Sequence, residues 1–136
     1  MLNLSDTSVG DIIKSNMSGV WYVATSGDKL YYTDCNTNTV TCCDLHGTIH
    51  WEFKDESVLQ NPRRITVDNN GNVYVVRCDS NNVVVISPDG QRHIQLLCSM
   101  DGLVNPRVLE YDKSTNRLLV VNDERTAFLF DITSRE

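Results

Sequence analysis

The sequence of 136 residues predicts an all-β protein, on the following observations. No window of helix length shows the 3.6-residue apolar period of an amphipathic helix. Short apolar runs recur instead. Residues 83–86 are apolar without alternation, as in a strand covered on both faces. Ile49, Trp51 and Phe53 alternate with polar residues, as in a strand with one buried and one solvent-exposed face. The Asn-Gly pair at 70–71 predicts a type I′ hairpin turn, because that turn needs positive φ.

An internal repeat narrows this fold class. Five residues recur 43 positions later: Tyr31, Cys35, Asn38, Val40 and Gly47 return as Tyr74, Cys78, Asn81, Val83 and Gly90. The tripeptide Asn-Pro-Arg at 61–63 returns at 105–107, which is 44 positions later. Units of this length that contain four short strands are characteristic of β-propeller blades. The sequence therefore predicts part of an antiparallel β-propeller.

We expect three blades, at residues 19–60, 61–104 and 105–132, with an N-terminal segment 1–18 and a tail 133–136. The inner strands are predicted near 20–24, 64–67 and 107–111, and the second strands near 30–33, 73–77 and 118–121. The third strands are predicted near 39–43, 83–86 and 127–130, and the outer strands near 49–53 and 93–97. The third unit lacks an outer strand, and residues 9–14 are a candidate outer strand for another blade. Since four to eight blades close a ring, we expect a larger propeller or pairing with another propeller half.

Composition and charge limit the function. Hydrophobic residues make up 40% of the chain and charged residues 22%, a balance typical of a folded domain. The net charge of −6 disfavours a broad nucleic-acid-binding surface, which needs dense Lys and Arg. No apolar run reaches the roughly 20 residues that span a bilayer. No signal peptide is recognisable at the N-terminus, so we expect a cytoplasmic protein whose five cysteines are reduced.

Residues 61–90 resemble the NHL repeat, in the pattern Pro-Arg-x-Ile-x-Val-Asp-x-x-Gly-x-Val-Tyr-Val-Val followed by Asn-x-Val-x-Val-Ile-x-x-Asp-Gly. Residues 19–132 resemble the last three NHL-like blades of a tripartite-motif (TRIM-NHL) or B-box protein. Arg64 stands where the NHL repeat usually has glycine after Pro-Arg. The resemblance implies that the propeller captures a protein substrate while a RING domain transfers ubiquitin. Because the chain has no RING or B-box zinc motif, we expect a non-enzymatic substrate-recognition module.

Loops on a rigid scaffold are the usual place for binding residues. In an up-and-down blade, the loop between the second and third strands lies at the same end as the connection to the next blade. Arginine in these loops suits carboxylate or phosphate recognition, because its planar fork binds two oxygens. The predicted ligand face comprises Arg63, Arg64, Arg77, Arg107, Asp34, Asn36, Asp79, Asn122 and Glu124. The alternative is that the arginines pair locally with carboxylates, and that Asp34 and Asp79 only cap turns.

Other functions stay open. RNA binding is one alternative, but acidic residues surround the predicted arginines, so a protein partner is favoured. A calcium-dependent lactonase or lyase is another, in which Asp34, Asp79 and Asn122 would face the central channel. The Leu-Tyr-Tyr-Thr-Asp run at 30–34 also resembles the Tyr-Trp-Thr-Asp motif of extracellular LDL-receptor-type propellers.

Catalytic residues, cofactors and metal ligands are not predicted. The sequence Cys-Cys-x-x-His-x-x-x-His at 42–50 contains the residue types of a zinc site. Adjacent strand residues point to opposite faces, however, so Cys42 and Cys43 are not expected to share one ion. Both are better explained as small buried hydrophobic residues.

Overall fold

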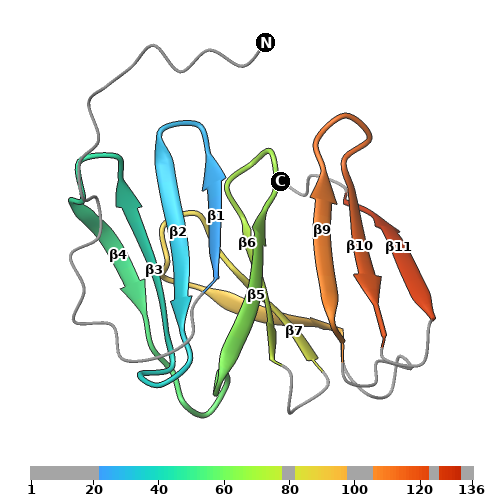
Figure 1. Cartoon of the computed structure of the whole chain (residues 1–136), viewed down its shortest axis with the longest axis horizontal. Helices are drawn as coiled ribbons and strands as arrows, with labels where there is room; N and C mark the ends of the chain where they lie inside the picture. The colour runs from blue at the N-terminus through green and yellow to red at the C-terminus, as the bar shows by residue number, and fades with distance from the viewer. Residues whose placement is uncertain (1–21, 78–81, 98–105, 123–125, 133–136) are drawn as a thin grey trace, which may run out of the picture.

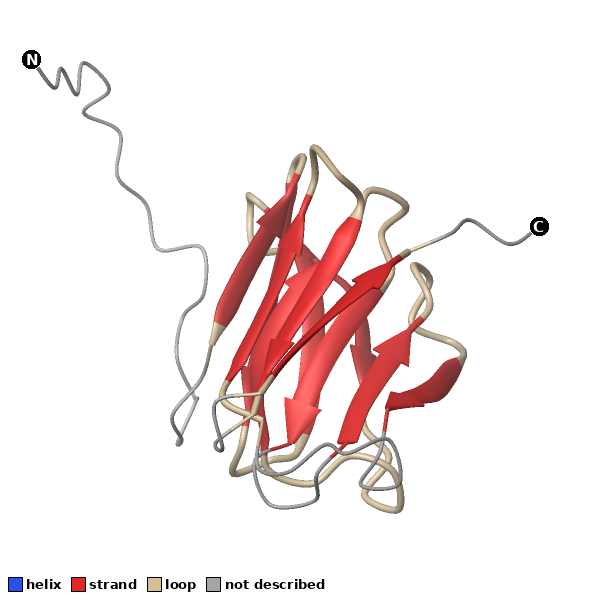
Figure 2. Ribbon diagram, turned by 90° about the vertical axis from the view of Figure 1, so that its right-hand side faces the viewer, coloured by secondary structure: helices blue, strands red, loops and turns tan. Residues whose placement is uncertain are grey.

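The computed structural model describes residues 22–77, 82–97, 106–122 and 126–132, and these residues form three antiparallel sheets without a helix. Figure 1 shows the three sheets following one another along the chain, and Figure 2 shows that their turns gather at the two ends of the strands. The all-β prediction is confirmed. The candidate strand at 9–14 and the predicted ligand-face residues Asp79 and Glu124 lie outside the described residues.

Each sheet corresponds to one sequence repeat. Blade 1 contains β1 (Val23–Ser26), β2 (Lys29–Asp34), β3 (Thr39–Asp44) and β4 (Ile49–Phe53) in that spatial order. Blade 2 contains β5 (Pro62–Val67), β6 (Val73–Arg77), β7 (Asn82–Ile86) and β8 (His93–Leu97), again in order. Blade 3 contains β9 (Val108–Asp112), β10 (Arg117–Val121) and β11 (Ala127–Asp131). Among the described residues blade 3 has no fourth strand.

The first strands of the blades lie along one side of the molecule. β5 lies against β1 and β2 of blade 1 and against β9 of blade 3, and Figure 1 shows it between them. This arrangement of inner strands is that of a β-propeller, in which successive sheets pack face to face around an axis. Within the described part of the chain, no helix is long and apolar enough to cross a bilayer.

The central strands of blade 2, β6 and β7, are buried on both faces, which explains their apolar runs. Val73, Val75 and Ile86 pack in one cluster with Tyr31 and Trp51 of blade 1. The neighbouring positions of the same strands face the other way, into a cluster with blade 3 that includes Tyr74, Val76, Val83, Leu118 and Val120. The unbroken run at 83–86 is therefore a strand between two blades, as the lack of alternation predicts.

Two predictions about individual strands are corrected. β1 covers Val23–Ser26 and so continues past the predicted end at residue 24, because the turn into β2 is made only at Gly27, with φ of 61°. Ile49 is 56% exposed, although Trp51 and Phe53 are buried. A register shift opposite Cys42 and Cys43 makes His50 an extra residue in β4 and breaks the alternation.

The turn at 68–72 connects β5 to β6, but it is not type I′. Gly71 has a φ of 86°, whereas Asn70 is not among the non-glycine residues with positive φ. Asp68 decides the turn geometry instead, because its Oδ1 accepts hydrogen bonds from the backbone nitrogens of Asn70 and Asn72, each at 2.9 Å. An Asp side chain that bonds its own turn competes with the tighter two-residue turn.

We expect native-state alkylation to distinguish the cysteines. Burial raises the pKa of the Cys42 and Cys43 thiols, and their exposed fractions are 1% and 2%. The thiolate is the reactive form, so both should resist iodoacetamide, while the partly exposed Cys35 should react. Peptide mass spectrometry after brief labelling measures this, with protein in concentrated guanidinium chloride as the fully reactive control. Equal native labelling of all three would contradict the packing of β3.

Candidate functional site

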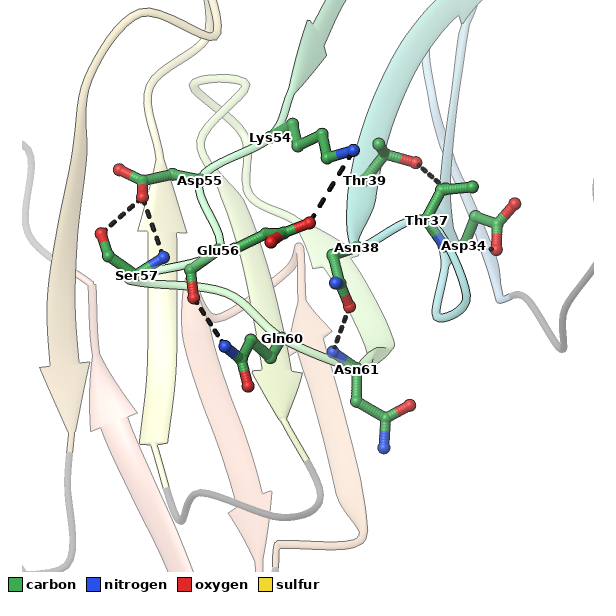
Figure 3. Close-up of polar contacts among 10 residues, drawn as sticks. All are labelled: Asp34, Thr37, Asn38, Thr39, Lys54, Asp55, Glu56, Ser57, Gln60 and Asn61. Atoms are coloured by element: carbon green, nitrogen blue, oxygen red, sulfur yellow. Dashed lines mark hydrogen bonds and ion pairs between the residues drawn. The ribbon is translucent and has the colours of Figure 1, made fainter.

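The β2–β3 turn and the connection from β4 to β5 meet at one end of blade 1 (Figure 3). Asn38 Oδ1 accepts a hydrogen bond of 2.8 Å from the backbone nitrogen of Asn61. Both asparagines have positive φ, 58° and 54°, a conformation that Asn tolerates better than most residues. The sequence analysis did not predict this contact between Asn38 and Asn61, although asparagine recurs at both positions in the repeat. The contact fixes the start of β5 relative to blade 1.

The connection at 54–61 is also held by its own polar groups, as Figure 3 shows. Asp55 Oδ1 accepts hydrogen bonds from the Ser57 hydroxyl at 2.5 Å and from its backbone nitrogen at 3.1 Å. The Ser57 hydroxyl bond is the main cause that lowers the pKa of Asp55. The Gln60 side-chain amide donates to the Glu56 carbonyl at 3.0 Å. The connection is therefore an ordered loop that leads directly to Arg63 and Arg64.

Arg63 and Arg64 lie in a β-bulge of β5. The register passes from Pro62 opposite Arg77 to Ile65 opposite Val75, so β5 has one residue more than β6 in this interval. The inner strands β1 and β9 pair without such a shift. Bulges redirect side chains and are frequent beside functional sites.

Two contacts tie this bulge to blade 1. The Thr33 hydroxyl donates a hydrogen bond of 2.9 Å to the Arg63 carbonyl, and Thr33 is completely buried. The Arg64 guanidinium lies over the Tyr22 ring, with 4.7 Å from its central carbon to the ring centroid, a cation–π contact. Tyr22 is itself held by a hydrogen bond from the Thr33 backbone nitrogen to its carbonyl, 3.0 Å. We name Tyr22, Thr33, Arg63 and Arg64 the arginine junction.

The arginine junction contains one unsatisfied group. Arg63 Nε is buried and has no hydrogen-bond partner, and it is the one such side-chain atom found in the described part of the chain. A guanidinium is charged at every physiological pH, so its nitrogens are obligatory donors. The arginine junction therefore contains a buried cationic nitrogen whose hydrogen-bonding capacity is not used within the described residues.

Other members of the predicted ligand face have structural roles. Asp34 is 4% exposed, and its Oδ1 accepts hydrogen bonds from the backbone nitrogens of Asn36 at 2.9 Å and Thr37 at 3.4 Å. Asp34 thus caps the β2–β3 turn, which agrees with the alternative interpretation of this residue. Arg77 donates to the carbonyls of Gln60 and Val58, both at 3.0 Å, and so holds the β4–β5 connection.

Blade 3 contributes two predicted residues whose surroundings differ. Arg107 is exposed just before β9, and its backbone nitrogen donates to the Val121 carbonyl at 2.8 Å. Asn122 is only 5% exposed at the end of β10, and its backbone nitrogen donates to the Thr126 carbonyl at 2.8 Å. Of the predicted ligand face, the structure joins Arg63 and Arg64 through shared contacts.

Hollows and candidate metal ligands lie apart from the arginine junction. A hollow of about 480 Å³ on blade 3 is lined by Glu110, Asp112, Arg117 and Leu129 among others, and by no residue of the predicted ligand face. A second, of about 430 Å³, lies beside Arg77 and β8. In the described ranges, no group of three His, Cys, Asp or Glu residues is placed to hold a metal ion.

Comparisons with known proteins place the fold but show no family. No protein-family model matches the chain. The mouse E3 ubiquitin-protein ligase TRIM56 is 31% identical over 77 residues, which cover 56% of this chain and 10% of TRIM56. The chain therefore spans about a tenth of this relative. The similarity supports the TRIM part of the resemblance, whereas the NHL assignment stays a prediction.

Solved structures confirm the propeller architecture. A nidogen/laminin complex superposes with a TM-score of 0.65 at 23% identity, over 80% of this chain and 43% of that one. A streptogramin B lyase superposes with a TM-score of 0.61 at 18% identity, over 90% of this chain and 44% of the lyase. A luciferin-regenerating enzyme superposes with a TM-score of 0.59 at 18% identity, over 90% of this chain and 42% of that enzyme. At these identities the likeness concerns the fold alone, and the chain spans less than half of each neighbour.

The prediction of a non-enzymatic module, drawn from the missing RING and B-box motifs, is wrong. Two of the structural neighbours, the streptogramin B lyase and the luciferin-regenerating enzyme, are enzymes. A propeller scaffold therefore carries catalysis in some proteins and binding in others, because function belongs to the loops rather than to the fold.

Proposed function

We propose that the chain is part of a protein-binding propeller that captures substrates for a TRIM-type ubiquitin ligase, with the arginine junction in its binding surface. The observation that carries the proposal is the 77-residue similarity to TRIM56 on a propeller scaffold. The proposal includes a cytoplasmic location, in which the free thiols of Cys35, Cys42 and Cys43 would stay reduced.

The arginine junction fits a protein partner for two reasons. Arginine is enriched at the energetic centres of protein interfaces, where its fork pairs with carboxylates. The junction is also ordered before any partner arrives, through the Thr33 bond to Arg63 and the stacking of Arg64 on Tyr22. Preorganised side chains lose less conformational entropy on binding.

Affinity capture with the full chain as bait tests the proposal. Arg64→Glu reverses an exposed charge in the junction, so we expect it to weaken partner capture about tenfold or more. Arg92→Glu is the matched control, because Arg92 is exposed in the β7–β8 turn at the opposite end of the blades. Equal loss in both variants, or no loss in either, would remove the junction from the binding surface.

Nuclease treatment separates a protein from an RNA partner in the same experiment. We expect captured proteins to remain after ribonuclease treatment and to depend weakly on salt. Capture that disappears with ribonuclease, and that falls steeply between low and high salt, would instead indicate RNA binding.

A further inference from the structure

Blades 1 and 2 each have one face that is covered by the blade that follows. In blade 1 this face includes Tyr31 and Cys42, which are buried against blade 2. In blade 2 it includes Tyr74, which is buried against blade 3. Side chains alternate between the two faces of a strand, so every blade of this chain has one face directed to the next sheet.

The same face of blade 3 is open among the described residues. Leu119 and Leu129 pair across β10 and β11 at the place that Tyr74 and Val85 occupy in blade 2, as the pairing of the strands shows. Leu129 is 57% exposed, and the hollow of about 480 Å³ lies beside both leucines. The apolar surface continues along the three strands at Val108, Val121 and Ala127. We name these five residues the blade-3 face.

Blade 1 presents an apolar face at the other end of the row of blades (Figure 1). Val23 pairs with Tyr32, and Ile49 pairs with Cys43, all on the side away from blade 2. We name Val23, Tyr32 and Ile49 the blade-1 face. Six large apolar side chains are exposed in the described part of the chain, and four of them lie on these two faces: Val23, Ile49, Val108 and Leu129. Exposed apolar residues that gather in this way mark interaction surfaces.

A second copy of the chain covers both faces at once. The sheets of a propeller pack face to face around one axis, and a closed ring needs at least about four blades. A two-fold axis that places blade 3 of one copy against blade 1 of the other makes two identical contacts and closes the ring. The chain spans 43%, 44% and 42% of the three propeller structures compared above, so two copies approach the length of one such propeller.

We propose that two copies of this chain pair into a six-bladed propeller, in which the blade-3 face of each copy packs against the blade-1 face of the other. Side chains of the opposing blade 1 fill the hollow beside Leu119 and Leu129. The inference goes beyond the proposed function, and it does not depend on which partner the propeller captures.

Sedimentation velocity of the full chain tests the pairing. We expect a single dimeric species from about 1 to 100 µM, without larger species, because a closed ring leaves neither face free. A monomer throughout this range would overturn the pairing and would mean that a different segment or protein covers the blade-3 face. Species that keep growing with concentration would overturn the closed ring.

Leu129→Asp places a carboxylate in both contacts of the pair. Each buried, unpaired carboxylate should weaken its contact about tenfold, so the dimer should weaken about a hundredfold. Ile94→Asp is the matched control, because Ile94 is 61% exposed but lies on blade 2, between the two faces, and we expect its dimer to be unchanged. Far-UV circular dichroism checks that both variants are folded. Equal weakening in both variants, or in neither, would contradict the proposed contact.

Ile49→Asp identifies the surface that meets blade 3. In the proposed ring this variant also weakens the dimer about a hundredfold. A mixture of Leu129→Asp and Ile49→Asp then forms a stronger dimer than either variant alone, because one of the two contacts in the mixed pair is native. A dimer that is sensitive to Leu129→Asp but not to Ile49→Asp would pair two blade-3 faces instead, and the six-bladed ring would be wrong.

Discussion

Replacing Gly90 with alanine is expected to lower the free energy of unfolding by about 3 kcal/mol. Gly90 has a φ of 74°, and a Cβ there would lie 2.5 Å from Cδ2 of the Trp51 ring. The ring cannot move away freely, because Trp51 is 9% exposed and its Nε1 donates a hydrogen bond of 2.9 Å to the Pro88 carbonyl. The substitution therefore combines backbone strain with overpacking at the contact between blades 1 and 2.

Gly27→Ala is the matched control. Gly27 also has positive φ, 61°, but no atom lies within 4 Å of the position that a Cβ would take there. We expect Gly27→Ala to lower the free energy of unfolding only by the cost of the positive φ, about 1 kcal/mol. Urea unfolding followed by far-UV circular dichroism measures both variants. Equal losses would show that Trp51 does not fill the space above Gly90.

Asp68→Ala is expected to cost about 3 kcal/mol of stability. The Asp68 carboxylate is 1% exposed and accepts four hydrogen bonds. Its Oδ2 accepts from the Tyr74 hydroxyl at 2.8 Å, and Tyr74 is 3% exposed in the cluster between blades 2 and 3. Burial, together with this bond to Asp68, raises the pKa of Tyr74, so its hydroxyl stays protonated as the donor. Removing the carboxylate leaves buried donors without an acceptor.

Asp112 provides the comparison, because it occupies the repeat position of Asp68 in blade 3. Its carboxylate accepts from the Ser114 hydroxyl and the Thr115 hydroxyl, each at 2.8 Å, but the residue is exposed. Water can replace the Asp112 carboxylate as the hydrogen-bond acceptor, so Asp112→Ala should lower the free energy of unfolding by about 1 kcal/mol or less. Thermal and urea unfolding of the two variants decide the point. A loss at Asp112 as large as that at Asp68 would mean that turn capping, not burial, sets the cost.

Much of the architecture was predictable from short-range signals. The outer strands β4 and β8 and the second strand β6 lie where the apolar runs place them. The repeat of 43 to 44 residues predicts the blades, because each unit must bury its apolar faces against its neighbours. The errors at Ile49 and at the 68–72 turn have different local causes. A bulge and a side-chain hydrogen bond each overrode a local preference.

The candidate site was predictable only as a group of residue types. The sequence placed Arg63, Arg64, Arg77 and Asp34 at one end of the blades, but it did not show which of them hold loops in place. Arg77 and Asp34 prove to hold loops through bonds to Val58, Gln60 and the β2–β3 turn.

The sequence by itself thus determined the strands, their repeat and the end of the blades at which Arg63, Arg64 and Arg77 lie, because periodicity and turn residues act over a few positions. The tertiary structure alone decided which arginine is left with an unpaired donor. That outcome depends on the bulge in β5 and on Thr33, which is 30 residues away in sequence but bonded to the Arg63 carbonyl. Contacts between blades join residues that no local pattern relates, so they appear only when the sheets are packed together.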